Sequence, residues 1–303
     1  MIAIGIDLGG TKIATQIFDA NWHCQAQHRI ATPTTYPALL AALAEQVAWA
    51  RTFDPQSVVG LGTAGLQDPA TGLLHAANLC ADQQTLAADL RQKLDGTPIT
   101  ALNDAQAFAL SEATFGAGRG ARRVFGLTLG TGLGGGLVLD GKLPAPASGL
   151  GGEIGHMAAP AHVIAAHDLP IRPCPCGRAG CLERYVAGPG LSFLAQHFTG
   201  ETLTPAEVIA QRTDSTAQVW QVWLSFLSEA LHTITLCCDP DIIVLGGGLS
   251  KVEGLIDALN RTREDHQLAG LAGPPVSIAQ GGDDSGARGA ALAAYLTHKE
   301  AKV

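Results

Sequence analysis

Charged residues are scarce in this 303-residue chain, at 15% of positions, whereas hydrophobic residues make up 47%. A disordered chain needs the opposite balance, so the composition predicts a compact globular protein. Basic residues are also few, because 27 Asp and Glu face 19 Lys and Arg, for a net charge of −8. This excess of acid disfavours a general nucleic-acid binder, which would present a basic surface.

Long apolar runs and targeting signals are also missing from the sequence. The longest apolar stretches are interrupted well before the ~18 residues that a membrane-spanning helix needs. The first ten residues, MIAIGIDLGG, have no basic region and place Asp7 inside the apolar run, so we do not expect a signal peptide. The expectation is a cytoplasmic protein with no membrane partner.

Glycine, by contrast, is abundant, with 37 residues gathered in short runs beside strand-like segments. The runs follow no short period, which excludes collagen and low-complexity linkers. Two segments share the order strand, glycine turn, strand and Asp turn, namely GIDLGGTKIATQIFDA at 5–20 and GLTLGTGLGGGLVLDG at 126–141. We interpret them as the openings of two repeated halves.

Strand-like and helix-like segments alternate along the chain, which predicts an α/β fold. Strands are expected at 2–6, 13–18, 124–129 and 137–139, and at the starts of 58–68, 99–116 and 239–250. Helices are expected at 37–51, 86–94, 104–116, 219–234 and 286–296, around a loop-rich stretch at 144–182. No Pro- or Ser-rich linker separates the two halves, so we expect two closely apposed lobes.

Three glycine turns are candidates for binding phosphate or nucleotide. DLGGTK at 7–12 and LGTGLGGG at 129–136 would let backbone N–H groups approach phosphate oxygens, and Asp7 can reach a metal ion through water. The spacing before Lys12 is not that of a P-loop. GGGLS at 246–250 can turn a helix N-terminus toward an anion or admit a nucleobase. Plain hairpin turns and tight strand-to-helix packing are the alternative interpretations.

Asn103 and Asp104 lie where a predicted strand ends and a helix begins. An aspartate at this position is often only an N-cap of the helix. The functional alternative is a general base that the fold holds over a ligand.

Three of the seven cysteines fall within the eight residues CPCGRAGC, namely Cys174, Cys176 and Cys181. Three thiolates with one more ligand would close a tetrahedral zinc site. His156 is the best fourth ligand, and His162 and His167 are also within reach. A ligand shell made only of protein side chains would make this zinc structural. The tight loop of CPCGRAGC, a zinc knuckle, would also fix the direction of the Glu183 side chain. The remaining cysteines, at 24, 80, 237 and 238, are expected to be small buried residues.

Together these motifs resemble the ROK family (repressor, open reading frame, kinase) of bacterial sugar kinases. The resemblance covers nearly the whole chain, in the order DLGGTK, LNDAQAFALSE, LGTGLGGG, GEIGH, CPCGRAGCLE, IIVLGGGLS and GARGAAL. It implies a two-lobed actin-like ATPase (ribonuclease H-like) fold that binds ATP and sugar in the cleft between the lobes. The small N-terminal lobe would comprise 1–117 and 290–303, and the larger lobe 118–289 would carry the zinc knuckle and the surface of a homodimer.

The resemblance also implies roles for single residues in transfer of the γ-phosphoryl group of Mg-ATP to a hexose, commonly at O6. Asp104 would be the catalytic base. The sugar would contact Asn78, Asn103, Glu153, His156 and Glu183. The nucleotide would contact Asp7, Gly9, Gly10, Thr11, Lys12, Gly130, Thr131, Gly132, Gly134, Gly247 and Gly248. His156 would offer one ring nitrogen to zinc, beside Cys174, Cys176 and Cys181, and the other to the sugar.

The stretch LLHAANL at 73–79 is similar to bacterial N-acetylglucosamine kinases, so N-acetyl-D-glucosamine is the expected substrate and N-acetylglucosamine 6-phosphate the product. Glucokinase, fructokinase and N-acetylmannosamine kinase are alternatives within the family. Two departures weaken this choice: Ala187 replaces the usual serine, and the loop at 63–65 lacks its frequent proline. A repressor would need a DNA-binding domain before Asp7, and a sugar sensor without activity would not need Asp104.

Overall fold

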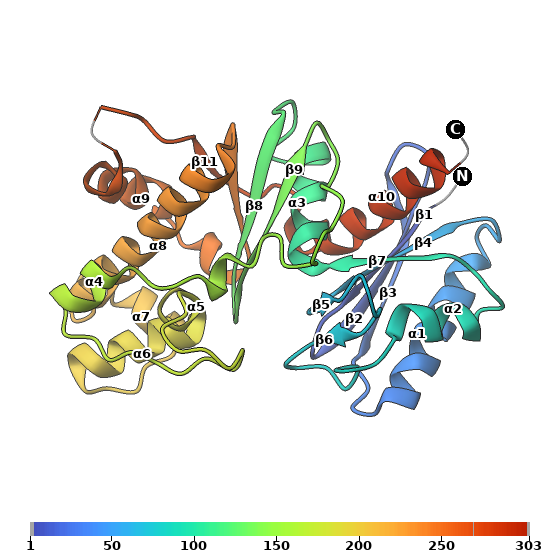
Figure 1. Ribbon diagram of the computed structural model, residues 1–303, viewed down its shortest axis with the longest axis horizontal. Coiled ribbons are helices and arrows are strands. Elements are labelled where there is room, and N and C mark those ends of the chain that lie inside the picture. The colour runs from blue at the N-terminus through green and yellow to red at the C-terminus, as the bar shows by residue number, and fades with distance from the viewer. Residues whose placement is uncertain (1–2, 269, 302–303) are drawn as a thin grey trace. The chain divides into compact units, whose positions relative to one another are not determined.

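The computed structural model describes residues 3–268 and 270–301, and contacts divide the chain into two units (Figure 1). The first unit comprises Met1–Arg119, Gly141–Gly151 and Gly281–Val303, and the second comprises Gly120–Asp140 and Gly152–Gln280. The chain thus re-enters the first unit at Gly281, whereas the sequence placed that boundary at 290. No helix within the described ranges combines the length and the hydrophobicity that crossing a bilayer requires.

The first unit is built on a five-stranded sheet of order β3-β2-β1-β4-β7. Its strands are β1 (Ala3–Leu8), β2 (Lys12–Phe18), β3 (Cys24–Ala31), β4 (Val58–Thr63) and β7 (Ile99–Asn103). β1, β4 and β7 are parallel, and β2 and β3 add an antiparallel meander. A short ribbon, β5 (Leu66–Gln67) and β6 (Leu74–His75), follows β4.

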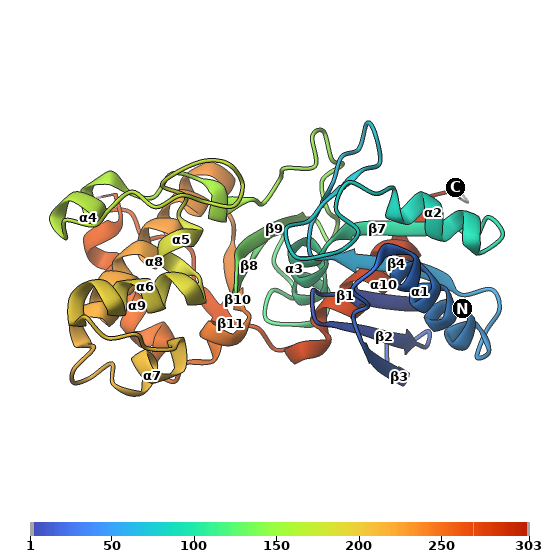
Figure 2. The same cartoon turned by 90° about the horizontal axis from the view of Figure 1, so that it is seen from below.

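Helices cover both faces of this sheet (Figures 1 and 2). Apolar side chains of β1, such as Ile4 and Ile6, share a core with α1 (Tyr36–Arg51) and α2 (Leu86–Lys93). On the other face α10 (Ser285–Glu300) packs against β1, β4 and α3 (Asp104–Phe115). The approach is so close that a Cβ on Gly5 would lie 1.8 Å from the Ala287 carbonyl oxygen. Small residues are therefore required where α10 crosses the sheet.

The second unit is built on a four-stranded sheet of order β11-β10-β8-β9. Its strands are β8 (Arg123–Leu129), β9 (Leu133–Leu139), β10 (Ile242–Gly246) and β11 (Val276–Ile278). β8 and β9 form an antiparallel hairpin, and β8, β10 and β11 are parallel. The hairpins β1–β2 and β8–β9 therefore hold equivalent positions in their sheets, in agreement with the repeat that the sequence indicates.

Helix α8 (Ala217–Cys238) is the centre of the second unit. α4 (Ala161–Ala166), α5 (Glu183–Val186), α6 (Gly188–Thr199), α7 (Pro205–Ala210) and α9 (Leu255–Arg263) all pack against it. The buried face of α8 carries Trp223 and Phe226, and the ring of Phe226 stacks on Tyr185 at 4.9 Å. The short 3-10 helices η1 (Ile154–His156), η2 (Gly248–Lys251) and η3 (Glu264–His266) also belong to this unit, and η4 (Gly282–Asp284) belongs to the first.

One expectation about the cysteines is wrong. Cys24 and Cys237 are exposed, and Cys80 and Cys238 are only partly buried. Cys24 begins β3, the edge strand of its sheet, and Cys237 lies in the last turn of α8, where the apolar stripe has ended. Hydrophobicity of the residue type alone therefore did not indicate burial at these positions.

Candidate active site

The strand ends of the first unit bring several predicted site residues to one edge of the sheet. Leu8, Thr63 and Asn103 are in register across β1, β4 and β7. Because these strands are parallel, the turns that follow their carboxyl ends lie side by side, which is where open α/β sheets bind ligands. The turn 9–11 and the start of α3 are thus neighbours along this edge.

Asn103 caps helix α3, and the Asp104 Oδ1 atom also accepts a hydrogen bond from the Ala105 N–H, at 2.8 Å. The Asn103 Oδ1 atom accepts hydrogen bonds from the N–H groups of Ala105 (2.8 Å) and Gln106 (3.3 Å). Its Nδ2 atom donates to the carbonyl oxygen of Gly65 at 3.0 Å. Asp104 is the first residue of the helix and is partly buried. The N-cap position belongs to Asn103, so the position of Asp104 at the first residue of the helix is compatible with a chemical role.

Asp7 is the last residue but one of strand β1 and faces the start of α10. A Cβ on Gly286 would lie 3.0 Å from the Asp7 carboxylate. Burial raises the pKa of Asp7, and the positive charge of Lys12 opposes that rise. The backbone of Asn78 covers the same turn, since a Cβ on Gly10 would lie 3.1 Å from the Asn78 carbonyl oxygen. A bound cation would relieve the cost of keeping this carboxylate charged.

The strand ends of the second unit border a pocket of about 680 Å³. It is lined by Gly130, Thr131, Gly188, Pro189, Ser192, Pro205, Gly248 and Leu249. Gly247 is required beside it, because its φ is +83° and a Cβ there would lie 2.3 Å from the Leu129 carbonyl oxygen. The Gly188 N–H donates to the Gly130 carbonyl oxygen at 2.8 Å and ties helix α6 to the turn. The pocket wall thus combines glycine backbone with the rings of Pro189 and Pro205, and such a wall suits a flat ligand ring with attached phosphates.

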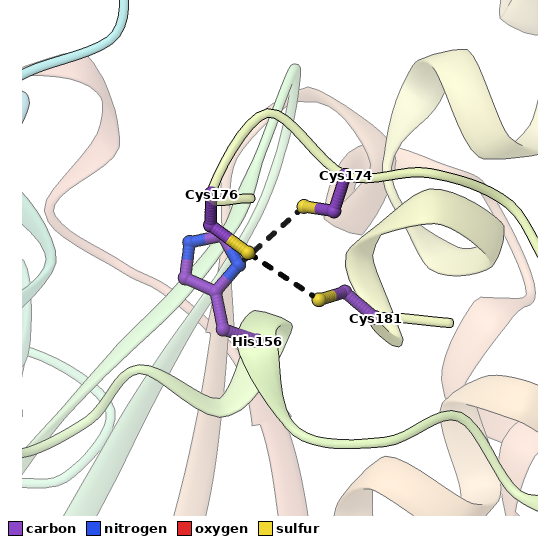
Figure 3. A group of neighbouring side chains, drawn as sticks. All are labelled: His156, Cys174, Cys176 and Cys181. Atoms are coloured by element: carbon purple, nitrogen blue, oxygen red, sulfur yellow. Dashed lines mark hydrogen bonds between the residues drawn. The ribbon is translucent and has the colours of Figure 1, made fainter. Parts of the chain in front are cut away.

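His156, Cys174, Cys176 and Cys181 converge on one point (Figure 3), and their ligand atoms lie within 4.8 Å of one another. The Sγ atoms of Cys176 and Cys181 are 3.6 Å apart, and Cys174 Sγ is 3.8 Å from His156 Nδ1. Zinc–sulfur bonds of about 2.3 Å at tetrahedral angles place sulfur atoms about 3.8 Å apart. The four side chains therefore fit a tetrahedral zinc ion. His162 and His167 lie outside this cluster.

The loop around these thiols is folded by its own backbone. Gly177 and Gly180 have φ of +86° and +72°, and the Cys174 N–H donates to the Arg178 carbonyl oxygen at 2.8 Å. A hydrogen bond from the backbone of Arg178 lowers the pKa of Cys176, whereas burial raises the pKa of Cys181. A dication at the centre would hold both as thiolates.

Two carboxylates extend from this cluster toward other parts of the same unit. The Glu153 Oε2 atom lies 3.6 Å from His156 Nε2, the ring nitrogen that faces away from the thiols. Burial raises the pKa of Glu153. Glu183 begins α5 directly after the loop, and its Oε2 atom accepts a hydrogen bond from the Leu133 N–H at 2.9 Å. The cysteine loop is thus fastened to the glycine turn between β8 and β9.

Comparison with known proteins identifies the family. The ROK family model matches residues 3–297. The chain belongs to the ROK family. It is 42% identical to the N-acetylgalactosamine kinase AgaK of Shewanella sp., over 95% of each chain, and 40% identical to an N-acetyl-D-glucosamine kinase of Salmonella paratyphi B, over 95% of this chain and 97% of the other.

Solved ROK structures agree with the fold. The ROK hexokinase of Thermus thermophilus superposes with a TM-score of 0.87 at 31% identity, covering 99% of this chain and 100% of that one. A ROK family glucokinase of Streptomyces griseus, solved with glucose and AMPPNP, gives 0.80 at 29% identity, covering 98% and 100%. The two-lobed actin-like fold implied by the sequence resemblance is confirmed.

Within this ROK protein the predicted site residues divide between the units. Those of the first unit gather at the carboxyl edge of its sheet, and those of the second surround the pocket and the Cys3His cluster. The sequence interpretation missed the part of the pocket made by helices, namely Gly188, Pro189, Ser192 and Pro205. The Pro residues near the starts of α6 and α7 were the available signal, since Pro marks a first helical turn.

Proposed function

We propose that this ROK-family chain is an ATP-dependent sugar kinase, a phosphotransferase with an alcohol group as acceptor. It transfers the terminal phosphoryl group of ATP to O6 of N-acetyl-D-glucosamine and releases N-acetylglucosamine 6-phosphate and ADP. The observation that carries this proposal is the 40% identity, over 95% of the chain, to a relative named N-acetyl-D-glucosamine kinase.

N-acetyl-D-galactosamine is the second candidate substrate, because the relative named N-acetylgalactosamine kinase is 42% identical over the same share of the chain. The two sugars differ only in the configuration at C4. Identities this similar do not separate them, so the choice rests with a direct comparison of the two sugars.

Asp104 is the proposed catalytic base. Phosphoryl transfer depends mainly on positioning and on neutralising charge, with the attacking and leaving oxygens in line. Aspartate is far too weak a base to ionise an isolated alcohol, so it accepts the O6 proton as the bond from O6 to phosphorus forms and the bond to ADP breaks. Asn103 is the N-cap of α3, and the hydrogen bond from the Ala105 N–H to Asp104 Oδ1 holds the carboxylate at the helix start.

ATP is assigned to the glycine turns of both units. Gly9, Gly10, Thr11 and Lys12 would contact phosphate oxygens, as would Gly130, Thr131, Gly132 and Gly134 of the second turn. Gly248 lines the 680 Å³ pocket, which suits adenosine, and Gly247 precedes it in the same turn. Asp7 would hold Mg²⁺ through water, and the ion would offset the rise in the Asp7 pKa that burial causes.

The sugar is assigned to Asn78, Asn103, Glu153, His156 and Glu183. Asn103 keeps one Nδ2 hydrogen beyond its bond to Gly65, and Glu183 keeps Oε1 beyond its bond to Leu133. The cysteine cluster would hold a structural Zn²⁺ that fixes the ring of His156 through Nδ1. Its Nε2 atom then points away from the metal, toward Glu153. The homodimer and the cytoplasmic location stay predictions.

The test is ADP release from Mg-ATP with a panel of sugars: N-acetylglucosamine, N-acetylgalactosamine, N-acetylmannosamine, glucose, mannose and fructose. We expect the highest kcat/KM with N-acetylglucosamine. Asp104→Asn should lower kcat by about 10²–10⁴-fold while sugar binding persists. Asp214→Asn, at an exposed position of the second unit, is the matched control and should leave kcat unchanged.

The outcomes separate the parts of the proposal. A higher kcat/KM with N-acetylgalactosamine would move the substrate to the C4 epimer and keep the base. A preference for glucose or fructose would reject the N-acetyl specificity but keep the kinase. No ADP release with any sugar, in a protein that binds ATP, would reject the kinase in favour of a sugar sensor.

A further inference from the structure

A second group of side chains of metal-ligating types lies in the second unit, apart from the cysteine loop. It consists of His162 from α4, Glu229 from α8 and His266 from η3. None of these residues has a role in the proposed phosphoryl transfer. We propose that His162, Glu229 and His266 form a second binding site for a divalent metal ion of the zinc type.

The donor atoms of the three residues converge. His266 Nδ1 lies 2.7 Å from Glu229 Oε1, and His162 Nε2 lies 3.2 Å from the same oxygen. All three ligand atoms lie within 4.8 Å of one another. Metal–ligand bonds of about 2.1 Å place neighbouring donor atoms about 3.0–3.4 Å apart at octahedral or tetrahedral angles. Both nitrogen-to-oxygen distances are therefore close to the spacing of ligands that share one ion.

Hydrogen bonding offers the competing explanation, in which the two imidazoles simply donate to the carboxylate. One carboxylate oxygen can accept both bonds, because a carboxylate offers about four acceptor positions on its two oxygens. Both ring nitrogens approach Oε1. In the neutral tautomers that carry the proton on the other ring nitrogen, the same three atoms each offer a lone pair to one ion, so metal binding distinguishes the two explanations.

Burial makes part of the site rigid and leaves part of it open. The side chains of His266 and Glu229 are 14% and 18% exposed, whereas that of His162 is 63% exposed. The two imidazole rings lie 6.2 Å apart with an angle of 37° between their planes. Two ligands are therefore held by packing, and the third faces solvent, from which an ion and its remaining water ligands can come.

The ligand set indicates which ions would bind. Two imidazoles and one carboxylate suit Zn²⁺, Co²⁺, Ni²⁺ or Cu²⁺, whereas Mg²⁺ and Ca²⁺ prefer oxygen ligands alone. The site lacks thiolates, so it differs chemically from the Cys3His cluster. A bound ion would join α4 and η3 to α8, three segments far apart in the sequence. We expect it to act as a clamp on this part of the second unit.

The test is calorimetric titration of Co²⁺ into the full-length chain after the cysteine cluster has been loaded with one equivalent of Zn²⁺. At about pH 7.5, where imidazole is mostly neutral, we expect one further site per chain. His162→Ala and His266→Ala should each weaken it by at least ~10-fold. His197→Ala, an exposed histidine of α6, is the matched control and should bind Co²⁺ as the unaltered chain does.

The absorption spectrum provides a second readout. Co²⁺ at the proposed site should give weak visible bands without the strong thiolate band that Co²⁺ in the cysteine cluster would produce. Glu229→Gln keeps a hydrogen-bond acceptor but removes the charge, so it should weaken Co²⁺ binding without loss of thermal stability. The proposal is overturned if no second Co²⁺ binds, or if binding is the same in the His162→Ala and His266→Ala chains.

Discussion

Helix α10 packs against the first sheet through backbone contacts that leave no room for one methyl group at Gly60. A Cβ at this position in β4 would lie 1.8 Å from the Ala290 carbonyl oxygen and 2.3 Å from its carbonyl carbon. Two residues along the same strand, a Cβ on Gly62 would meet Ala107, Ile6 and Ala290 at ordinary distances of 3.6–3.7 Å. Gly60→Ala and Gly62→Ala therefore form a matched pair.

The expected difference follows from these distances. Cβ contacts below 3.0 Å essentially never occur, so Gly60→Ala must push the Ala290 backbone back by at least 1.2 Å from its 1.8 Å contact. Neither the strand nor the helix can rotate a side chain out of the way. Because overpacking a core costs about 1–3 kcal/mol when side chains can adjust, we expect Gly60→Ala to cost at least about 3 kcal/mol. Gly62→Ala should stay within about 1 kcal/mol of the unaltered chain.

Urea unfolding and thermal denaturation of the two variants, side by side, measure this difference. At an unfolding entropy of about 2.1 cal/mol/K per residue, about 3 kcal/mol lowers the Tm of a 303-residue chain by roughly 5 °C. Equal midpoints for the two variants would refute the inference that backbone contact between α10 and β4 sets the spacing of these layers. A large loss in Gly62→Ala would refute it equally, because ordinary contacts surround that position.

Three further predictions concern single residues of the candidate site. Burial raises the pKa of Asp7, so its charge destabilises the fold above that pKa; Asp7→Asn should raise the free energy of unfolding near neutral pH, and urea unfolding should show this gain shrinking toward about pH 4. Cys181→Ala, made in a His162→Ala chain so that the second proposed site is removed, should abolish zinc binding and lower Tm, as elemental analysis and calorimetry would show; zinc retained at one equivalent there would contradict the assigned ligand set. Glu183→Ala should raise KM for ATP by releasing the Leu133 N–H, whereas Glu183→Gln, which keeps an acceptor, should change it little; a change confined to KM for the sugar would argue against this tie.

The helices with clear apolar periodicity could be predicted from the sequence, whereas the exposed edge strand β3 could not. The predicted helix at 37–51 appears as Tyr36–Arg51, and the predicted start near 103–104 is the observed start of α3. The edge strand β3 was missed because its residues CQAQHRIA are mostly exposed and few are strongly apolar, although Ala26 and Ile30 alternate with Gln25, Gln27 and Arg29. Strands of this kind are stabilised by pairing with β2, which a local pattern does not reveal.

The candidate site divides in the same way. The glycine turns and the cysteine loop carry their chemistry in contiguous residues, so their spacing alone predicted them. Part of the wall of the 680 Å³ pocket comes from α6 and α7. These helices reach the glycine turn only through tertiary contacts, such as the hydrogen bond from the Gly188 N–H to the Gly130 carbonyl oxygen. The cluster of His162, Glu229 and His266 brings together residues from three elements, and no spacing rule joins them.

The cysteine cluster links three features of the second unit. Its histidine turns Nδ1 to the thiols and Nε2 toward Glu153, so a metal at the cluster fixes the ring that is proposed to meet the sugar. Two residues past Cys181, Glu183 holds the Leu133 N–H at the end of the glycine turn proposed to meet phosphate. A hydrogen bond to a charged group is worth about 1.5–3 kcal/mol, enough to keep a glycine turn in one conformation. The zinc ion would therefore stabilise both ligand-binding elements at once without contacting either substrate.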